Sequence, residues 1–344
     1  MAVRLIYNHI EHHARHSGYD QLAKYVQGKA YRKGPLFRVA DALPRRWLER
    51  LPYHGTSWYY GDAIPREVEI CGRMLLPRKT LYHFFYAEND LRFTGTWRRR
   101  WNNKIVGTFH QPPAFLDKHV EDKAYIRGVD GAVVVSRSQV EYMCEHLPED
   151  RVFCVPHGVD THHWCPDPSV QRADIPTFTF VGWWLRDVEL AKTAITNLAD
   201  AGVTARVRII TPKEHVDAFA GLPQTDVLHS ISDEELLAEY RRSHALFLPL
   251  NLSTANNAIL EAMACGTGVI STRTGGIPEY VDDEAAILLE PGDADGAVEA
   301  MRSIANDRGK VDAMGEAARA KAETLSWERV GQQMNAAYDR ILTS

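Results

Sequence analysis

Two turns in the second half of this chain carry groups that could bind an anion. A polar turn, 251–254, follows the apolar run 245–250 and leads into a segment with helical periodicity, 255–264. Unpaired N–H groups and the dipole at the start of such a helix favour a phosphate. In the turn after another apolar run, 177–181, Arg186 is the one cation, and a guanidinium suits phosphate oxygens. The two turns therefore predict a site for a phosphate-bearing ligand.

A parallel sheet would bring these turns together. Short β-rich runs alternate with helix-period segments throughout the second half, which indicates parallel βαβ units. Strands are expected at 177–181, 205–210, 227–229, 245–249, 268–271 and 286–289, and helices at 188–201, 213–220, 233–242, 255–264 and 294–306. Ser232 and Glu235 have the spacing of a capping box. Ligands of doubly wound sheets bind outside the carboxyl ends of the strands, where both turns fall.

The first half of the chain alternates less regularly. Strands are expected at 4–7, 81–86, 104–109, 132–135 and 152–155, and helices at 19–27, 113–127 and 138–146, whereas 28–66 shows no clear period. His110 follows a strand and precedes a Pro-Pro pair, a position that favours a functional role over a structural one. The proline-interrupted segment 157–169 marks a domain boundary, and the chain ends in one amphipathic helix.

Length and composition are those of a globular enzyme with two domains. The chain has 344 residues, of which 45% are hydrophobic and 25% are charged. No apolar run approaches the length of a membrane span, and the first apolar stretch turns polar too early for a signal peptide. Five cysteines without C-x-x-C spacing indicate reduced thiols in the cytoplasm and no cysteine-bound zinc.

Charge is distributed unevenly between the two halves. Residues 1–165 carry 24 Lys+Arg and 18 Asp+Glu, a balance of +6, whereas 166–344 carry 16 and 27, a balance of −11. Within the basic half, the run WRRRW at 97–101, with Lys104, could rest on an anionic bilayer surface, face an acidic glycan, or form a solvated helix face. Nucleic acid is not an expected partner, because the chain is acidic overall and has no reader motif.

The segment LEAMACGTGVIST, 260–272, followed by GGIPE, 275–279, resembles the donor-binding segment of glycosyltransferase family 4, the retaining GT-B enzymes that use nucleotide-diphosphate sugars. The resemblance implies an α/β fold of two Rossmann-like, doubly wound domains that face a cleft. It implies an acceptor-side domain at 1–160, joined by a final helix, 326–344, that crosses back to it, and a nucleotide-sugar-binding domain at 161–325.

The same resemblance implies the reaction and its partners. The expected activity is transfer of a hexosyl group from a UDP- or GDP-sugar to a hydroxyl of a glycan, lipid-linked or small-molecule acceptor, without a metal or another cofactor. The expected location is the cytoplasm, with peripheral contact at the inner membrane surface through the basic N-terminal half.

Roles for single residues also follow from the resemblance. Glu261 matches the second glutamate of the family's E-x7-E pair, which holds ribose hydroxyls. His110 matches an active-site histidine that lies against the donor sugar and the acceptor. Gly18 follows the first strand, where the family has a glycine-rich loop near the diphosphate, and Gly182 stands where the family has a glycine after the first strand of the second domain. The turn HGVD, 157–160, resembles one that shapes the cleft.

Two departures from the family pattern bear on activity. Ser253 stands where the first glutamate of the pair would fall, and it has no carboxylate for the donor sugar. Asn256 and Asn257 are expected either to replace those contacts or to cap the helix. The family's Arg and Lys after Gly182 are missing, so Arg186 is expected to neutralise the diphosphate.

Other functions remain open at this point. The departures also fit a non-catalytic GT-B subunit that binds a nucleotide sugar without turnover, and a sugar-nucleotide epimerase shares the architecture. A nicotinamide dehydrogenase is disfavoured, because no G-x-G-x-x-G follows the first strand. Five histidines invite a metal but lack a carboxylate or cysteine partner at convincing spacing, namely His12, His13, His16, His162 and His163.

Overall fold

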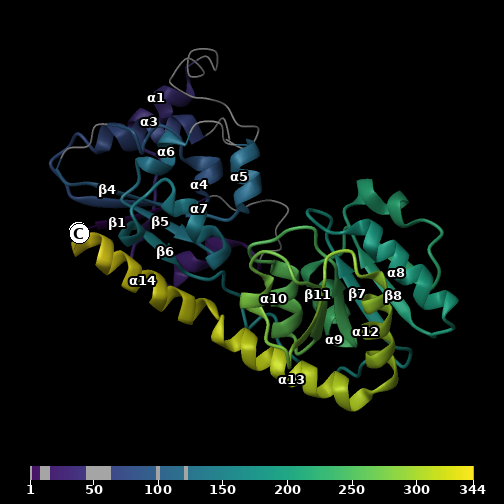
Figure 1. Ribbon diagram of the computed structural model, residues 1–344. Helices are drawn as coiled ribbons and strands as arrows, with labels where there is room; N and C mark the ends of the chain where they lie inside the picture. The colour runs from purple at the N-terminus through teal and green to yellow at the C-terminus, as the bar shows by residue number, and fades with distance from the viewer. Residues whose placement is uncertain (1, 8–15, 44–62, 98–100, 120–122, 344) are drawn as a thin grey trace. The chain divides into compact units, whose positions relative to one another are not determined.

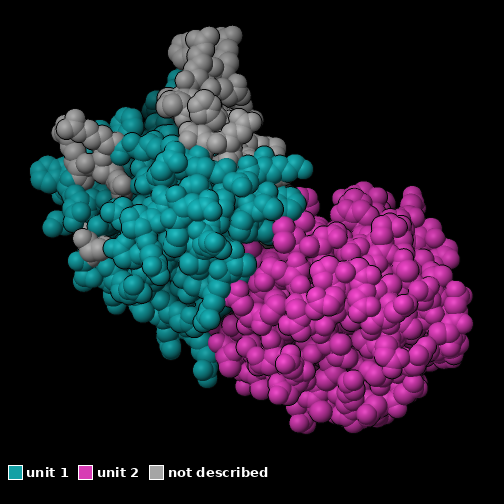
Figure 2. Space-filling model, viewed as in Figure 1, with its two compact units in different colours: residues 1–11, 19–157, 328–344 teal, residues 12–18, 158–327 magenta. Residues whose placement is uncertain are grey.

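The computed structural model describes residues 2–7, 16–43, 63–97, 101–119 and 123–343. The chain forms two compact units (Figure 2). Unit 1 comprises residues 1–11, 19–157 and 328–344, and unit 2 comprises 12–18 and 158–327. Each unit is built around a parallel sheet of six strands with helices packed against it (Figure 1). This confirms the predicted α/β class with two Rossmann-like, doubly wound units.

The sheet of unit 1 has the strand order β2-β1-β3-β4-β5-β6. Its strands are β1 (Ala2–Ile6), β2 (Lys29–Ala30), β3 (Thr80–Phe84), β4 (Lys104–Phe109), β5 (Gly131–Val134) and β6 (Val152–Cys154). Every residue of β3 and β5 is buried, as expected for parallel strands covered on both faces. The order reverses between β1 and β3, so the loops after these two strands lie at the switch point of the sheet.

Among the described residues of unit 1, the helical segments that the sequence predicted are shorter than expected, and three helices, Pro35–Asp41, Ala63–Arg73 and Ala87–Asp90, were not predicted. The helices are α1 (Pro35–Asp41), α3 (Ala63–Arg73), α4 (Ala87–Asp90), α5 (Pro113–His119), α6 (Ala124–Arg127) and α7 (Val140–Cys144). The segment expected as one helix at 113–127 is divided into α5 and α6, and the helix expected at 19–27 is a 3-10 helix, Tyr19–Lys24. The strand β2 and the helix α1 lie in the stretch without a clear period.

The last helix, α14 (Trp327–Thr343), packs on unit 1 from Glu328 onward. The hydroxyl of Tyr338 lies 2.6 Å from Nδ1 of the buried His83 on β3. The side-chain amide of Asn335 accepts from the N–H of Gln27 at 2.7 Å. The predicted return of the C-terminal helix to the first unit is therefore confirmed.

The sheet of unit 2 has the strand order β9-β8-β7-β10-β11-β12. Its strands are β7 (Thr177–Val181), β8 (Arg206–Ile210), β9 (Thr225–Leu228), β10 (Ala245–Leu248), β11 (Gly268–Thr272) and β12 (Ala286–Leu289). Numbered from β7, this is the order 3-2-1-4-5-6 of Rossmann dinucleotide-binding folds. The switch point therefore lies between β7 and β10, where the two predicted phosphate-side turns begin.

Unit 2 forms the five expected helical segments, one of them as a 3-10 helix, and two further helices, Ile277–Tyr280 and Arg308–Thr324, that the sequence pattern did not predict. The helical segments are α8 (Val188–Asp200), a 3-10 helix (Lys213–Phe219), α9 (Asp233–Arg242), α10 (Asn257–Ala264), α11 (Ile277–Tyr280), α12 (Ala294–Asn306) and α13 (Arg308–Thr324). The predicted capping box of α9 is present, because Ser232 and Glu235 exchange side-chain-to-backbone hydrogen bonds of 3.2 and 2.7 Å. Within the described ranges, no helix combines the length and apolarity needed to cross a membrane.

Candidate active site

The two predicted turns of unit 2 meet at the carboxyl edge of its sheet. The turn after β7 and the turn after β10 are joined by an antiparallel bridge between Arg186 and Leu250. The N–H of Asp187 donates to the carbonyl of Pro249 at 2.9 Å, and the N–H of Asn251 donates to the carbonyl of Leu185 at 3.0 Å. These backbone contacts place the arginine of one turn against the start of the other.

The guanidinium of Arg186 is folded back into its own turn. Its Nε donates to the carbonyl of Val181 at 2.9 Å, and one terminal nitrogen donates to the carbonyl of Trp184 at 3.0 Å. Burial lowers the pKa of Arg186 to about 10, so the group remains charged at neutral pH. Gly182 has a φ of +88°, and a Cβ there would lie 2.9 Å from the guanidinium. Glycine is thus required beside this cation.

The start of α10 follows the second turn. The side chain of Asn256 accepts from the N–H of Ile259 at 3.4 Å and so caps the helix, which is the second of the two roles expected for it. The Nδ2 group of Asn257 donates to the carbonyl of Ser17 at 3.0 Å. Ser253 is buried, its hydroxyl donates to the carbonyl of Ala255 at 3.1 Å, and its own carbonyl accepts from the N–H of Gly276 at 2.9 Å.

Glu261 lies on α10 and is buried in the interior of unit 2. Its Oε2 accepts a hydrogen bond of 3.0 Å from the hydroxyl of Tyr240 on α9. Burial raises the pKa of Glu261, while the Ser17 hydroxyl, Tyr240 and the charge of Arg186 oppose that rise. The Ser17 hydroxyl lies close to the carboxylate but makes no hydrogen bond of ordinary geometry. Each of the two charges therefore favours the other, because Arg186 lowers the pKa of Glu261 and Glu261 raises the pKa of Arg186.

Asp160 organises the turn at 157–163. Its carboxylate accepts from the N–H groups of His162 and His163, both at 3.1 Å, and bonds Nδ1 of His16 at 3.0 Å. The rings of His16 and His163 stack with centroids 3.7 Å apart. Across the described ranges, no group of three or more His, Cys, Asp or Glu side chains is arranged to hold a metal. His12 and His13 lie outside those ranges.

His110 stands at the end of β4 in unit 1, among aromatic rings. Its Nε2 lies 2.7 Å from the carbonyl of Phe85, which can only accept, so the proton resides on Nε2. Tyr19 contacts the imidazole edge to face at 4.6 Å, and Tyr86 lies 4.9 Å away. Burial lowers the pKa of His110 to about 4. The ring is therefore neutral at physiological pH.

Glu88, on α4, holds the turn that presents this histidine. Its carboxylate accepts from the N–H of His110 and, at 2.9 Å, from the N–H of Gln111. The side chain is 1% exposed, and burial raises its pKa. Glu88 acts on the backbone of the turn, which fixes the direction in which the histidine ring projects.

Comparison with known sequences identifies the kind of protein that carries this geometry. A family model described as glycosyl transferases group 1 matches residues 211–321, which include α9, α10 and the turn between them. The MMP alpha-(1->4)-mannosyltransferase of Mycolicibacterium hassiacum is 26% identical over 358 residues, covering 94% of this chain and 86% of that protein. Through residues 211–321, this chain is similar to the glycosyl transferases of group 1.

Other relatives are similar to this chain in sequence, and solved structures share its fold. The glycosyltransferase is 36% identical over 131 residues to a D-inositol 3-phosphate glycosyltransferase of Kribbella flavida, covering 37% of this chain and 31% of that protein. The structure of sucrose-phosphate synthase from Thermosynechococcus elongatus aligns with a TM-score of 0.73 at 17% identity, covering 99% of each chain. Anabaena Alr3699/HepE in complex with UDP-glucose aligns with a TM-score of 0.69 at 12% identity, covering 98% and 99%. The predicted family resemblance and GT-B fold are thus confirmed.

The predicted site residues of the glycosyltransferase are divided between the units. Six of them belong to unit 2: five lie in the two turns and at the start of α10, namely Gly182, Arg186, Ser253, Asn256 and Asn257, and Glu261 lies one turn further along α10. Gly18 is buried at the end of the segment 12–18, which belongs to the same unit, and His110 belongs to unit 1.

Sequence reasoning missed two buried side chains beside these residues, Tyr240 and Glu88. The only sequence signal for Tyr240 was its place on a predicted helix. Glu88 had no such signal, because it follows a predicted strand in a stretch to which no element was assigned.

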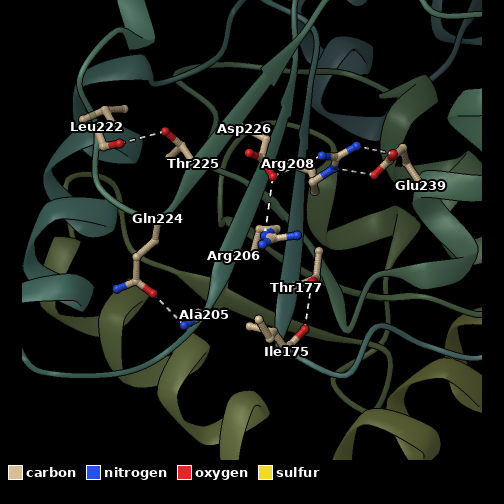
Figure 3. A network of polar contacts seen from close by, with 10 residues as sticks. All are labelled: Ile175, Thr177, Ala205, Arg206, Arg208, Leu222, Gln224, Thr225, Asp226 and Glu239. Atoms are coloured by element: carbon tan, nitrogen blue, oxygen red, sulfur yellow. Dashed lines mark hydrogen bonds and ion pairs between the residues drawn. The ribbon is translucent and has the colours of Figure 1, made fainter.

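A hollow of about 500 Å³ lies at the opposite edge of the unit 2 sheet. Its lining consists of residues at or just before the amino ends of β7, β8 and β9, together with the end of α8: Ile175, Ala199, Gly202, Val203, Thr204, Ala205, Arg206 and Gln224. Beside it, Arg208 forms ion pairs with Asp226 at 3.1 Å and Glu239 at 2.6 Å (Figure 3). Arg206 also pairs with Asp226 at 3.5 Å, so both arginines have carboxylate partners within the protein.

Proposed function

We propose that this glycosyltransferase moves a hexosyl group from a UDP- or GDP-sugar to an acceptor hydroxyl, with retention of the anomeric configuration. The observation that carries the proposal is the junction of Arg186 with the start of α10 at the switch point of unit 2. A partly buried guanidinium and the N–H groups at the start of a helix stabilise the negative charge that grows on a departing diphosphate. Two relatives are named for transfer of mannosyl or glycosyl groups, and Anabaena Alr3699/HepE is described in complex with UDP-glucose, which supports a sugar nucleotide as the donor.

In this reaction the chain's residues have distinct roles. The bond from the anomeric carbon to the diphosphate breaks, a bond to the acceptor oxygen forms on the same face, and the acceptor proton passes to a phosphate oxygen. Arg186 neutralises the diphosphate, and Glu261 holds the ribose. His110 is neutral at working pH, so it orients the reacting groups and does not deliver a proton. None of these roles requires a metal ion.

Nucleotide binding and turnover by the purified full chain test this proposal. UDP or GDP, but not ADP, is expected to raise the melting temperature by several degrees, since a ligand at 100 times its Kd adds about 2.7 kcal/mol. The matching nucleotide sugar should then release nucleoside diphosphate when an acceptor is present, and proton NMR should show a product with the donor's anomeric configuration. Binding without turnover would indicate a non-catalytic subunit, and an inverted product would refute retention.

The acceptor is proposed to be lipid-linked or held at an anionic lipid surface. One apolar face of unit 1 consists of side chains that are 46–63% exposed, namely Leu36, Val39, Leu75, Leu76 and Trp101. Its parts adjoin one another, because the indole of Trp101 donates to the carbonyl of Leu75 at 3.3 Å and Leu36 lies over Gly72 of α3. The described residues of the segments 29–43, 72–79 and 94–104, which contribute to this face and flank it, carry eight Lys+Arg and one acid. Arg98, Arg99 and Arg100 lie outside the described residues.

Vesicle co-sedimentation tests this lipid contact. The chain should bind vesicles of phosphatidylglycerol mixed with phosphatidylcholine, should release them in high salt, and should leave pure phosphatidylcholine unbound. Trp101→Ser should weaken binding about tenfold, because burial of a large apolar side chain is worth about 1.5–3 kcal/mol. Trp184→Ser is the matched control, since Trp184 of unit 2 is equally exposed at 55%. Equal effects of the two substitutions, or binding that does not depend on lipid charge, would contradict the proposal.

A further inference from the structure

Tyr240 places its hydroxyl inside unit 2 against a carboxylate. The residue lies on α9 with no exposed surface, and its hydroxyl is 3.0 Å from Oε2 of Glu261 on α10. Burial and the neighbouring carboxylate raise the pKa of Tyr240, so the phenol keeps its proton and donates it. A hydrogen bond from a phenol to a carboxylate strengthens when the carboxylate is ionised, so this contact favours the charged form of Glu261.

The surroundings of Tyr240 hold its ring in place. The ring packs edge to face on the buried Trp164, with centroids 5.8 Å apart. Its carbonyl accepts from the hydroxyl of Thr267 at 2.8 Å and from the N–H of Ser243 at 3.2 Å. Because ring and backbone are both fixed, the phenol oxygen is a rigid point that sets the position of one oxygen of the carboxylate.

The other oxygen of that carboxylate, Oε1 of Glu261, is held less tightly. Within the described part of the chain, no hydrogen bond of ordinary geometry reaches Oε1 of Glu261. The Ser17 hydroxyl is near the carboxylate, and the positive charge of Arg186 acts on it. A carboxylate that is held at one oxygen and less constrained at the other can accept hydrogen bonds from a ligand in a defined direction.

We propose that Tyr240 is a positioning residue for the donor nucleotide: its hydroxyl holds Oε2 of Glu261 so that Oε1 is presented to the ribose hydroxyls. The inference rests on the proposed role of Glu261 in the donor site. It adds that the selectivity for a ribonucleotide depends on a side chain that does not touch the ligand.

The test compares ribo- and deoxyribonucleotide binding by the full chain. Isothermal titration calorimetry gives Kd for UDP and GDP and for their 2′-deoxy counterparts. The wild-type chain is expected to bind the ribonucleotide about tenfold more tightly, because a charged carboxylate loses a partner in the deoxy ligand. Tyr240→Phe should reduce this ratio to about twofold while leaving the deoxynucleotide Kd unchanged. The ribonucleotide affinity of Tyr240→Phe should also begin to fall at higher pH than in the wild type, because Glu261 loses the donor that favours its ionised form.

Two further variants control for a merely structural effect. Tyr338→Phe removes another buried phenol hydroxyl, bonded to His83 in unit 1, and should leave the ratio at its wild-type value. Replacing Tyr240 with 4-aminophenylalanine keeps a donor at the same place and should retain most of the ratio, which gives a second measurement if Tyr240→Phe does not fold.

The outcomes separate the two proposals. If the wild-type chain binds the ribonucleotide and the 2′-deoxyribonucleotide with equal affinity, Glu261 does not hold the ribose, and this inference fails with that role. If the wild-type chain prefers the ribonucleotide and Tyr240→Phe has the same ratio of deoxyribonucleotide Kd to ribonucleotide Kd, only the inference about Tyr240 is overturned. Loss of the ratio in the 4-aminophenylalanine variant would also overturn it.

Discussion

Arg186→Ala is expected to lower kcat/KM for the nucleotide sugar by about 100- to 1000-fold, with a higher donor KM and a lower kcat. The guanidinium is the cation of the turn after β7, and its partial burial makes its charge more effective than it would be in water. Loss of one preorganised donor to a developing anion costs roughly this much in other enzymes. Steady-state kinetics on the full chain measure the effect.

The control for this substitution is another arginine of the same unit. Arg208→Ala removes the side chain on β8 that pairs with Asp226 and Glu239 (Figure 3) and should leave the kinetics unchanged. Because Arg186 also binds two backbone carbonyls, Arg186→Ala should be assayed below its own melting temperature. Wild-type kinetics in a folded Arg186→Ala chain would remove the arginine from the mechanism.

His110→Ala is expected to lower kcat about 10- to 100-fold and to change the donor KM little. The neutral imidazole orients groups at the reacting centre, so its loss raises the free energy of the transition state more than it weakens donor binding. Because burial lowers its pKa to about 4, the wild-type rate should show no inflection near pH 6.5 from this residue. The folded chain takes up this proton only near pH 4, whereas the unfolded chain takes it up near 6.5. The contribution of His110 to stability is therefore present above about pH 6.5 and is lost as the pH falls towards 4.

A matched variant separates this role from a general loss of an imidazole. His146→Ala alters a partly buried histidine that follows α7 in the sequence and is not part of the turn that carries His110. This substitution should leave kcat unchanged. An inflection near pH 6.5 in the wild type that disappears in His110→Ala would show that the ring titrates and acts as an acid or base.

The architecture of unit 2 was predictable because its signals are local. Apolar runs spaced by helix-period segments predicted the six strands, and the capping box at Ser232 depends on residues three apart. The junction of the two turns also followed, since parallel strands end at one edge. The capping by Asn256 was one of two expected roles, and only the structure distinguishes them.

The contacts that define the candidate site were not predictable in the same way. Tyr240 and Glu261 are 21 residues apart and meet because α9 and α10 pack beside each other. Glu88 reaches the backbone of His110 across 22 residues. Such partners are set by packing, which no single-sequence period encodes. In unit 1, β2 was missed for a different reason, since two exposed residues carry no hydrophobic pattern.

A structure of the full chain with its bound nucleotide or nucleotide sugar tests the central claim most directly. The diphosphate is predicted to lie within hydrogen-bond distance of the Arg186 guanidinium and of N–H groups at the start of α10, with the ribose against Glu261. A nucleotide bound elsewhere, for example in the hollow at the amino edge of the unit 2 sheet, would contradict the account.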